Sequence, residues 1–224
     1  YTPSRKSCDE LGQKLGRKGL LTLCYHAGLS PETRAHNQNQ FFHSNHKIMV
    51  ATIAFAMGID KKNIRSVIHC FLPPSFTSYY QQIGRAGRDG LAAKALLLLA
   101  ENETKRLLYL LEKTYPPYEV LKNCEDELSN DLEVLERFQF FKEKAKYCKK
   151  EKFLSPKWQS SYLEHKIKLQ KNIEEISQFA YQRINCRMQS LCKALGAKKE
   201  DLEVCSLCDY CCPEKSLFIK KVFK

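Results

Sequence analysis

Short apolar runs alternate with amphipathic segments through the first hundred residues of the chain. The apolar runs at 20–26, 47–52, 66–71 and 94–100 are typical of β-strands, and the segments at 7–17, 30–43 and 77–86 are typical of helices. Near-continuous apolar strands separated by helices indicate a parallel sheet that is covered on both faces. The pattern therefore predicts an α/β domain over residues 1–100.

The pattern becomes purely helical after residue 100. Apolar residues recur at spacings of three and four, which places them on one stripe of a helix of about 20 residues. A second apolar stripe predicts a return helix that is antiparallel to the first. The first stripe consists of Leu128, Leu132, Leu135, Phe138 and Phe141, and the second of Ile167, Ile173, Ile176 and Phe179.

The composition is that of an ordinary globular protein with an excess of positive charge. The 224 residues, 43% hydrophobic and 28% charged, allow one large or two small domains. The net charge of +12 favours a polyanionic partner such as nucleic acid, although a merely soluble basic protein is the alternative. The excess is concentrated in 1–100 and in the lysine-rich segment 142–171, which we place at the tip of the helical hairpin.

Apolar runs and cysteines bear on the cellular compartment. The longest apolar run, at 92–100, is about half of the roughly 20 residues that a membrane span needs, so we expect no membrane partner. Eleven cysteines, an odd number with a tight cluster near the end, fit a reduced compartment with a metal site better than a disulfide scaffold. We expect a cytoplasmic protein. Because the chain starts abruptly at Tyr1 without a signal peptide, we also expect a fragment of a longer chain.

The segment QQIGRAGRDG at 81–90 carries the first candidate chemistry. Arg85 and Arg88 lie three residues apart, and a guanidinium is a permanently charged fork of donors that suits a transferring phosphoryl group. The alternative is a surface loop with two solvated arginines. Glycines between them would let a phosphate approach the backbone closely; these are Gly84, Gly87 and Gly90.

Two further segments follow predicted strands. In YHAGLS, His26 and Gly28 lie where a strand meets the start of a helix, which is where anions bind in parallel sheets. In VATIAFAMGIDK, the Thr52 hydroxyl can donate to a phosphate and Asp60 can accept from a ribose hydroxyl. Each of these residues alone is more often a cap or turn residue.

The C-terminal cysteines form a candidate metal site. Four thiolates with this spacing can close a tetrahedral, structural zinc site. The alternatives are buried cysteines without a metal and an iron–sulfur cluster that uses Cys192 or Cys212. Three of the zinc candidates lie in CSLCDYC and one lies upstream; they are Cys186, Cys205, Cys208 and Cys211.

These motifs, in this order, resemble the second RecA-like lobe of superfamily-two helicases of the RecQ family. YTPSRKS resembles motif IV, YHAGL the segment after it, VATIAFAMGIDK motif V and SYYQQIGRAGRDG motif VI. The resemblance implies three regions. Residues 1–100 would be the second helicase lobe with motifs IV to VI, 101–185 a helical hairpin or linker with a basic tip, and 186–224 the family's zinc-binding module.

The resemblance implies roles for single residues in an ATP-dependent DNA helicase that moves 3′ to 5′. Arg88 would be the arginine finger on the γ-phosphate, with Arg85 beside it. Gln81 would link the nucleotide state to lobe closure, and Gly58 and Asp60 would contribute to the nucleotide site, with Asp60 on the ribose.

The resemblance also implies the contacts with DNA. His26, Gly28 and Thr52 would grip phosphates of the translocated single strand, so single-stranded and forked DNA are the expected partners. Two positions depart from the family pattern: Ala56 replaces a common Gly, and Gln82 replaces the Glu that usually follows the first Gln.

Neither a Gly-x-x-x-x-Gly-Lys-Ser/Thr phosphate loop nor an acidic Asp-Glu box occurs in the sequence. In this family both belong to the first RecA-like lobe, which holds ATP and magnesium and which we expect upstream of Tyr1. The chain by itself should therefore neither hydrolyse ATP nor unwind DNA. The alternatives are a non-catalytic nucleic-acid-binding zinc module that acts with a partner and a helicase-like remodeller of RNA.

The lysine-rich segment 142–171 also contains aromatic residues. Its lysines could contact duplex phosphates while an aromatic ring stacks on a base. A solvated helical tip is the alternative. The aromatic residues are Tyr147, Phe153, Trp158 and Tyr162.

Overall fold

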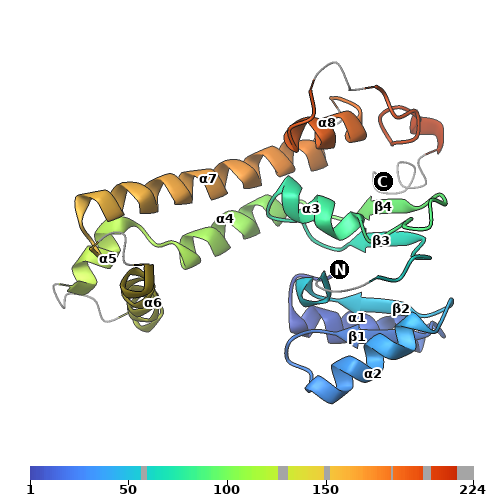
Figure 1. Cartoon of the computed structure of the whole chain (residues 1–224), viewed down its shortest axis with the longest axis horizontal. Helices are drawn as coiled ribbons and strands as arrows, with labels where there is room; N and C mark the ends of the chain where they lie inside the picture. Colours follow the sequence, from blue (N-terminus) through green and yellow to red (C-terminus); the bar gives the residue numbers. More distant parts are fainter. Residues whose placement is uncertain (57–59, 126–130, 149–151, 183, 199–202, 216–224) are drawn as a thin grey trace. The chain divides into compact units, whose positions relative to one another are not determined.

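The computed structural model describes the whole chain except residues 57–59, 126–130, 149–151, 183, 199–202 and 216–224 (Figure 1). The chain forms two compact units. The first contains Tyr1–Glu101 together with Phe179–Lys224, and the second contains Asn102–Gln178. The α/β region and the cysteine-rich end thus share one unit, and the helical region forms the other.

The first unit contains the predicted strands and helices of the α/β domain at the predicted places. Each of its first three helices begins at a serine whose side chain accepts a backbone N–H three residues on, which satisfies a donor that the first helical turn leaves free. The elements are α1 (Arg5–Arg17), β1 (Thr22–Tyr25), α2 (Pro31–Phe42), β2 (Ile48–Ala51), η1 (Ile53–Ala56), β3 (Ser66–His69), α3 (Phe76–Ile83) and β4 (Lys94–Leu97).

The strands pair in parallel, as predicted, but as two separate pairs. β1 pairs with β2, and β3 pairs with β4. The first two residues of the chain bridge the pairs, because the Thr2 N–H donates to the Ala51 carbonyl at 2.9 Å and the Cys70 N–H donates to the Tyr1 carbonyl at 2.9 Å. The single continuous sheet that the apolar pattern indicated is therefore interrupted between β2 and β3.

An aromatic core fixes α2 against the first strand pair. Phe41 of α2, Ala51 of β2 and Phe55 of η1 are buried together. The Phe55 ring lies 4.8 Å from the Tyr25 ring and 5.8 Å from the Phe41 ring, in tilted and edge-on contacts that aromatic pairs favour. This core holds the carboxyl ends of β1 and β2 at fixed positions, and the candidate loops leave the sheet from these ends.

A buried histidine ties β3 to α3. His69 is fully buried, and its Nε2–H donates to the amide oxygen of Gln82 at 2.6 Å. The rings of Tyr1, Phe71 and Tyr79 surround it at 5.2 to 6.0 Å. Burial lowers the pKa of His69 to about 4, although the bond to Gln82 acts in the opposite direction. The imidazole is therefore neutral at physiological pH.

The second unit is helical and contains both predicted helices, but they do not form the predicted antiparallel hairpin, because α7 runs along α4 while α6 is seen end-on in Figure 1. α7 packs along α4, where Lys166 pairs with Glu112 at 2.7 Å and Thr104 lies 2.5 Å from Ser177. Leu128, which we placed on the first stripe, lies outside the described residues. The helices are α4 (Glu103–Thr114), α5 (Tyr118–Glu125), α6 (Leu132–Cys148) and α7 (Pro156–Tyr181), of which the last continues into the first unit.

The aromatic residues of the lysine-rich segment pack into the core of this unit. Tyr162 is buried, and its hydroxyl donates to the Pro116 carbonyl at 2.6 Å. The Trp158 ring stacks on Tyr162 at 5.0 Å, and Phe153 meets Trp158 edge-on at 4.9 Å. These contacts favour packing over base stacking for these three rings. The side chain of Tyr147 lies outside the described residues.

The cysteine-rich end packs on the α/β part of the first unit. Phe179, near the end of α7, contacts the rings of Phe76 and Tyr79 in α3 at 5.1 and 5.8 Å. The short helices α8 (Arg187–Ala194) and η3 (Pro213–Lys215) follow. Within the described ranges, no helix combines the length and apolarity that crossing a bilayer requires.

The buried His69 predicts acid sensitivity. Its pKa is about 4 in the folded chain and 6.5 as the ordinary value, so only the unfolded chain binds the proton between these pH values. The free energy of unfolding should therefore fall by about 2 kcal/mol between pH 7 and pH 5 through this residue alone. Urea unfolding at both pH values should show this loss, and His69→Gln should reduce it. The variant of an exposed histidine, His46→Gln, should leave the loss unchanged, and an equal effect of both variants would contradict the assignment.

Candidate functional site

The candidate loops of the first unit leave the carboxyl ends of neighbouring strands. The Thr52 N–H donates to the Tyr25 carbonyl at 3.1 Å, which places the end of β2 beside the end of β1. His26 and Gly28 follow Tyr25 directly, so the structure gathers all three predicted DNA-contacting residues at one edge of the sheet. Carboxyl ends of parallel strands that lead into helix starts are where anionic ligands bind.

At this edge of the sheet, the side chain of His26 stabilises the loop that follows β1. The side chain is buried, its Nε2 lies 3.0 Å from Asp9 Oδ1, and its Nδ1 accepts the Gly28 N–H at 3.2 Å. The ring therefore donates from Nε2 and accepts at Nδ1, and both nitrogens are used within the domain. In this conformation the His26 Nε2–H and the Gly28 N–H both donate to groups within the domain. Neither is therefore the first donor that a phosphate would meet. DNA contact by His26 and Gly28 remains a prediction.

Arg5 is a cation at this edge that the motif analysis missed. A Cβ added at Gly28 would lie 3.0 Å from Arg5 Cδ and 3.2 Å from His26 Nδ1, so the absence of a side chain at Gly28 lets Arg5 lie against the loop. Arg5 begins α1 directly after its serine cap and is exposed. The YTPSRKS segment contains it, but nothing in the spacing of this segment indicates a neighbour 23 residues away.

Arg88 and Asp60, both expected at the nucleotide, form an ion pair with each other. Arg88 Nη1 lies 3.0 Å from Asp60 Oδ1, and Arg88 Nε donates to the Gly84 carbonyl at 3.1 Å. The Asp60 side chain is 75% exposed and that of Arg88 34%, so the pair lies at the surface. The structure thus brings together two residues that are 28 positions apart in the sequence.

The glycines of motif VI have a conformational role. Gly87 and Gly90 adopt φ values of 70° and 79°, in the left-handed region that side chains disfavour. The loop is held by Arg65, whose Nη2 lies 2.5 Å from both carboxylate oxygens of Asp89. The bond to Arg65 is the main reason that the pKa of Asp89 is lowered. The sequence predicted only that these glycines let a phosphate approach the backbone.

The other residues that were expected at the nucleotide site do not belong to the Arg88–Asp60 ion pair. Gln81 is exposed on α3, and Arg85 is half-buried in the turn that follows. Gly58 lies outside the described residues. Ala56 ends η1, a 3-10 helix, in which φ is negative, so a glycine is not required there. Gln82 is the buried partner of His69.

The four predicted metal-ligating cysteines converge in the structure. Their sulfur atoms all lie within 4.8 Å of one another, although Cys186 is 19 residues upstream of Cys205. The other two members of the set are Cys208 and Cys211. Cys192 and Cys212, the alternative ligands, are not part of this cluster, and Cys212 Sγ instead lies 2.9 Å from the Ser206 carbonyl.

Backbone donors favour thiolates in this cluster. The Cys205 N–H donates to Cys186 Sγ and the Arg187 N–H donates to Cys208 Sγ, both at 3.4 Å. Burial alone would raise the pKa of Cys186, but the N–H donors of Cys205 and Gln189 lower it to about 6. A thiolate is the form that ligates metal. Burial and the neighbouring thiols raise the pKa of Cys205 and raise that of Cys211 to about 12. The positions of the four sulfur atoms fit a tetrahedral four-thiolate metal site, and the backbone donors favour the thiolate at Cys186 and Cys208.

A second group of possible metal ligands also lies in the first unit. Ligand atoms of Cys8, Asp9 and Cys24 also lie within 4.8 Å of one another. Burial, however, raises the pKa of Cys8 and raises that of Cys24 to about 12. The Cys8 thiol donates to the Val50 carbonyl at 3.1 Å and the Cys24 thiol donates to the Cys8 carbonyl at 3.7 Å, so this group behaves as part of the packing of α1 against the strands.

Arg187 anchors the cysteine cluster and was missed by the sequence analysis. Its Nε and Nη2 donate to the two carboxylate oxygens of Asp209 at 2.8 and 3.0 Å. Its guanidinium lies over the Phe179 ring at 5.2 Å and also donates to the Phe179 carbonyl. The side chain therefore links the end of α7 to the CSLCDYC segment. A single arginine between two cysteines carries no sequence signal for such a contact.

Comparisons with known proteins agree with the motifs. Residues 1–90 match the family described as helicase conserved C-terminal domain. The chain is 42% identical over 114 residues to the ATP-dependent DNA helicase RecQ of Bacillus subtilis, which is 51% of this chain and 19% of that protein. It is also 42% identical over 113 residues to the RecQ-like DNA helicase BLM of Xenopus laevis, covering 50% of this chain and 8% of that protein. The chain thus aligns with less than a fifth of the length of these relatives.

Among solved structures, the C-terminal domain of the DEAD-box protein Dbp5 is similar in fold to part of the chain. The match has a TM-score of 0.41 and 24% sequence identity, and it covers 51% of this chain and 67% of that one.

The left-handed backbone at Gly87 predicts a local stability effect. Gly87→Ala should lower the free energy of unfolding by about 1 to 2 kcal/mol, because an alanine Cβ is strained at this φ and would lie 3.1 Å from the Leu91 carbonyl. Chemical denaturation measures this change. Gly16→Ala is the matched control, since Gly16 is inside α1 and its added Cβ would make only an ordinary 3.6 Å contact. A loss at Gly16 as large as at Gly87 would refute this explanation.

Proposed function

We propose that the chain works as the second lobe of an ATP-dependent DNA helicase that moves 3′ to 5′, because residues 1–90 match the helicase conserved C-terminal domain and the chain is 42% identical over 114 residues to a RecQ helicase. In this proposal an ATP-binding lobe outside the chain holds ATP and magnesium. The chain adds an arginine finger and contacts to single-stranded DNA. By itself it neither hydrolyses ATP nor unwinds DNA.

The observation that carries the proposal is the surface ion pair between Arg88 and Asp60. The bond from Arg88 Nε to the Gly84 carbonyl orients the guanidinium, while Nη1 is held by an exposed carboxylate. An exposed ion pair of this kind contributes only about 0 to 1 kcal/mol. A triphosphate carries several charges and would accept charge-assisted hydrogen bonds from the same fork. Arg88 can therefore exchange Asp60 for a γ-phosphate at little energetic cost.

The exchange also releases Asp60. Its carboxylate, 75% exposed, then becomes available to accept from a ribose hydroxyl, as the resemblance implies. One movement of the guanidinium would thus form both nucleotide contacts together. Arg85, half-buried three residues earlier, adds a second positive charge to the same loop. The chemistry required of this chain is charge stabilisation of a transferring phosphoryl group, since the nucleotide itself belongs to the other lobe.

Single-stranded DNA would bind at the edge formed by the loops after β1 and β2. The Thr52 hydroxyl, Arg5 and Lys6 are the groups that can meet phosphates there, because Thr52 is at the end of β2 and α1 begins at the same edge. Phosphate contacts carry affinity rather than base specificity, so binding should be independent of sequence and should weaken steeply with salt. Single-stranded and forked DNA are the proposed partners.

We also propose that the four-cysteine cluster holds one structural zinc ion. Cys186, Cys205, Cys208 and Cys211 fill a tetrahedral set without an open position, so the ion would join the start of α8 to the CSLCDYC segment. The convergence of the four sulfur atoms and the backbone N–H groups that donate to Cys186 Sγ and Cys208 Sγ support this occupant. Arg187 and Asp209 would stabilise the same junction from outside the ligand set.

Removal of the proposed arginine finger tests the helicase role. In the chain joined to the ATP-binding part of a RecQ-type helicase, Arg88→Ala should lower DNA-stimulated ATP hydrolysis by roughly a thousandfold. DNA affinity should stay the same, because Arg88 contacts Asp60 and Gly84, whereas the proposed DNA-contacting groups follow β1 and β2. Arg17→Ala, an exposed arginine in the last turn of α1, is the matched control and should keep full activity.

Two other outcomes would decide against this role. Full hydrolysis by the Arg88→Ala protein would exclude an arginine finger at this position. No hydrolysis by the joined protein before any substitution would favour a non-catalytic nucleic-acid-binding module. Competition between single-stranded DNA and RNA of equal length separates DNA translocation from RNA remodelling, because an RNA remodeller would prefer the RNA.

Metal analysis tests the zinc proposal. The reduced, purified chain should contain one zinc ion, and Cys208→Ser should remove it and lower the melting temperature, because three thiolates cannot close the site. Cys212→Ser should retain the ion, since Cys212 lies in the same segment but outside the cluster. Zinc in the Cys208→Ser protein, or its absence from the unchanged chain, would refute the proposal.

A further inference from the structure

The residues on both sides of the proposed arginine finger are held by a short segment that precedes β3. Before Arg88, the Gly87 N–H donates to the Ile64 carbonyl at 3.0 Å. After Arg88, the Asp89 carboxylate binds the Arg65 guanidinium, with both of its oxygens 2.5 Å from Arg65 Nη2. Two consecutive residues of this segment therefore contact the loop immediately before and immediately after Arg88.

The Arg65 guanidinium binds the loop and its own segment at the same time. Its Nη1 donates to the Ala92 carbonyl at 3.1 Å, which adds a second contact with the loop. Its Nε donates to the Asn63 carbonyl at 3.3 Å, and Nη2 also lies 3.4 Å from the Lys62 carbonyl. A guanidinium presents five N–H donors in one plane, whereas an ammonium is a single point of charge. The set of contacts is therefore specific to arginine.

Asp89 connects the Arg65 contact to the backbone of the loop. Its Oδ1 accepts the Leu91 N–H at 3.1 Å, and the Gly90 N–H donates to the Gly87 carbonyl at 3.0 Å. The turn is thus closed by its own hydrogen bonds, and the Asp89 carboxylate is one of the groups that close it. A displacement of this carboxylate would change the backbone from which the neighbouring arginine side chain extends.

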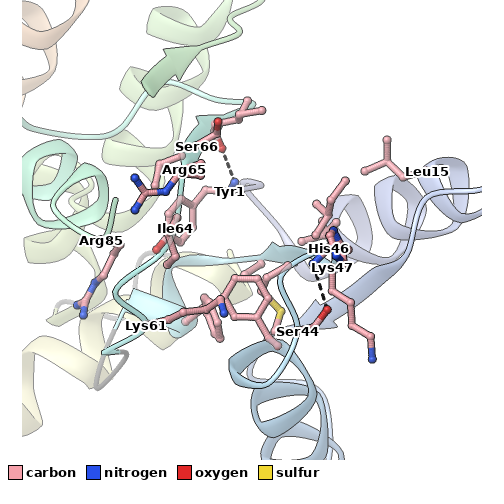
Figure 2. Close-up of a pocket in the computed structure, with 18 of the residues that line it drawn as sticks. Tyr1, Leu15, Ser44, His46, Lys47, Lys61, Ile64, Arg65, Ser66 and Arg85 are labelled. Carbon is pink, nitrogen blue, oxygen red and sulfur yellow. Dashed lines mark hydrogen bonds between the residues drawn. The ribbon is translucent and has the colours of Figure 1, made fainter. Parts of the chain in front are cut away.

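The segment that carries Arg65 also carries Asp60, and its other end is anchored in the core. Lys61 is buried, its Nζ donates to the Phe42 carbonyl at 3.0 Å, and it lies over the Phe41 ring at 5.5 Å. Figure 2 shows that the side chains of Lys61 and Arg65 leave this segment in different directions. The segment is therefore fixed at one end by Lys61 and at the other by Arg65.

We propose that Arg65 is a positioning residue for the arginine finger. Its bonds to Asp89 and to the Ala92 carbonyl hold the loop in the position from which Arg88 contacts Asp60 or, in its place, a γ-phosphate. The inference rests on the proposed role of Arg88 in ATP hydrolysis. Arg65 itself contacts no nucleotide in this arrangement, so its effect on the reaction passes through the position of Arg88.

Stability and catalysis should respond differently to the loss of this contact. The side chains of Arg65 and Asp89 are 40% and 23% exposed, and an ion pair at the surface contributes little to stability. Charge stabilisation of a reacting group depends strongly on geometry, and a misplacement of about 1 Å can cost roughly a hundredfold in rate. A positioning residue therefore affects the rate far more than the melting temperature.

The first test uses the chain alone and measures the side chain of Arg88. The Arg88 Nε–H donates to the Gly84 carbonyl at 3.1 Å, so its exchange with water, followed by nuclear magnetic resonance, reports the orientation of the guanidinium. Arg65→Ala should speed this exchange by about tenfold. The melting temperature should fall by no more than about 4 °C. Arg106→Ala removes an arginine from its ion pair with Glu103 in α4, and this matched control should leave the Arg88 signal unchanged.

The second test uses the chain joined to the ATP-binding part of a RecQ-type helicase. Arg65→Ala should lower the kcat of DNA-stimulated ATP hydrolysis by about a hundredfold and leave the KM for ATP within about twofold, because the lost interaction acts on the charge that develops during the transfer. Arg106→Ala should keep both values. A purely structural role would instead lower the melting temperature and the amount of active protein without this division between kcat and KM.

Variants of Asp89 test whether Arg65 acts through this carboxylate. Asp89→Ala should cause about the same loss of kcat as Arg65→Ala, and the double variant should lose no more than either single variant. Asp89→Asn retains an oxygen that can accept from Arg65 and from Leu91, so it should recover part of the rate. A double variant whose loss equals the product of the two single losses would show that the residues act independently and would overturn the proposal.

Failure of this inference and failure of the proposed function give different results. If Arg88→Ala stops hydrolysis but Arg65→Ala changes neither kcat nor the Arg88 signal, Arg65 is not a positioning residue and the arginine finger stands. If Arg88→Ala leaves hydrolysis intact, the proposed function is wrong. The exchange of the Arg88 Nε–H in the chain alone then decides whether Arg65 holds this side chain, and an unchanged exchange rate would refute it.

Discussion

The backbone hydrogen bonds of Tyr1 and Thr2 are the constraint on which the geometry of the first unit depends. They connect the end of β2 to the end of β3, and among the described residues no other strand ladder joins the two strand pairs. Thr52 follows one pair, whereas α3 and the loop with Arg88 follow the other. The proposed DNA-contacting edge and the proposed arginine finger therefore keep their relative position through two residues at the start of the chain.

The parts of this structure that were predictable depend on local signals. Each strand is a short apolar run and each of the first three helices is an amphipathic segment, so the apolar pattern located them. The four cysteines were found because their spacing itself encodes a metal site. The interruption between β2 and β3 was not predictable, because the apolar sequence of a strand does not show which other strand pairs with its edge.

The site residues that escaped prediction act through long-range contacts. Arg187 contacts Asp209 and Phe179, and Arg5 contacts Gly28, but none of these pairs has a characteristic spacing. His26 was predicted for the right loop, yet its two ring nitrogens bind Asp9 and Gly28. The sequence pattern places a polar residue at an edge of the sheet. Whether the side chain of that residue faces solvent or stabilises the loop depends on tertiary packing.

The departure at Gln82 has an explanation in the same packing. Family members usually carry Glu at this position of motif VI, whereas here the side chain is buried against the imidazole of His69. A neutral imidazole donates one hydrogen bond, and an amide oxygen accepts it without placing a charge in the core. A carboxylate could accept the same hydrogen bond from the neutral imidazole, but it would place a net charge in the core, and burying an uncompensated charge costs several kcal/mol. The neutral pair therefore suits a core in which three aromatic rings enclose the histidine, and it links α3, which leads into the arginine loop, to β3 without an ionisable partner.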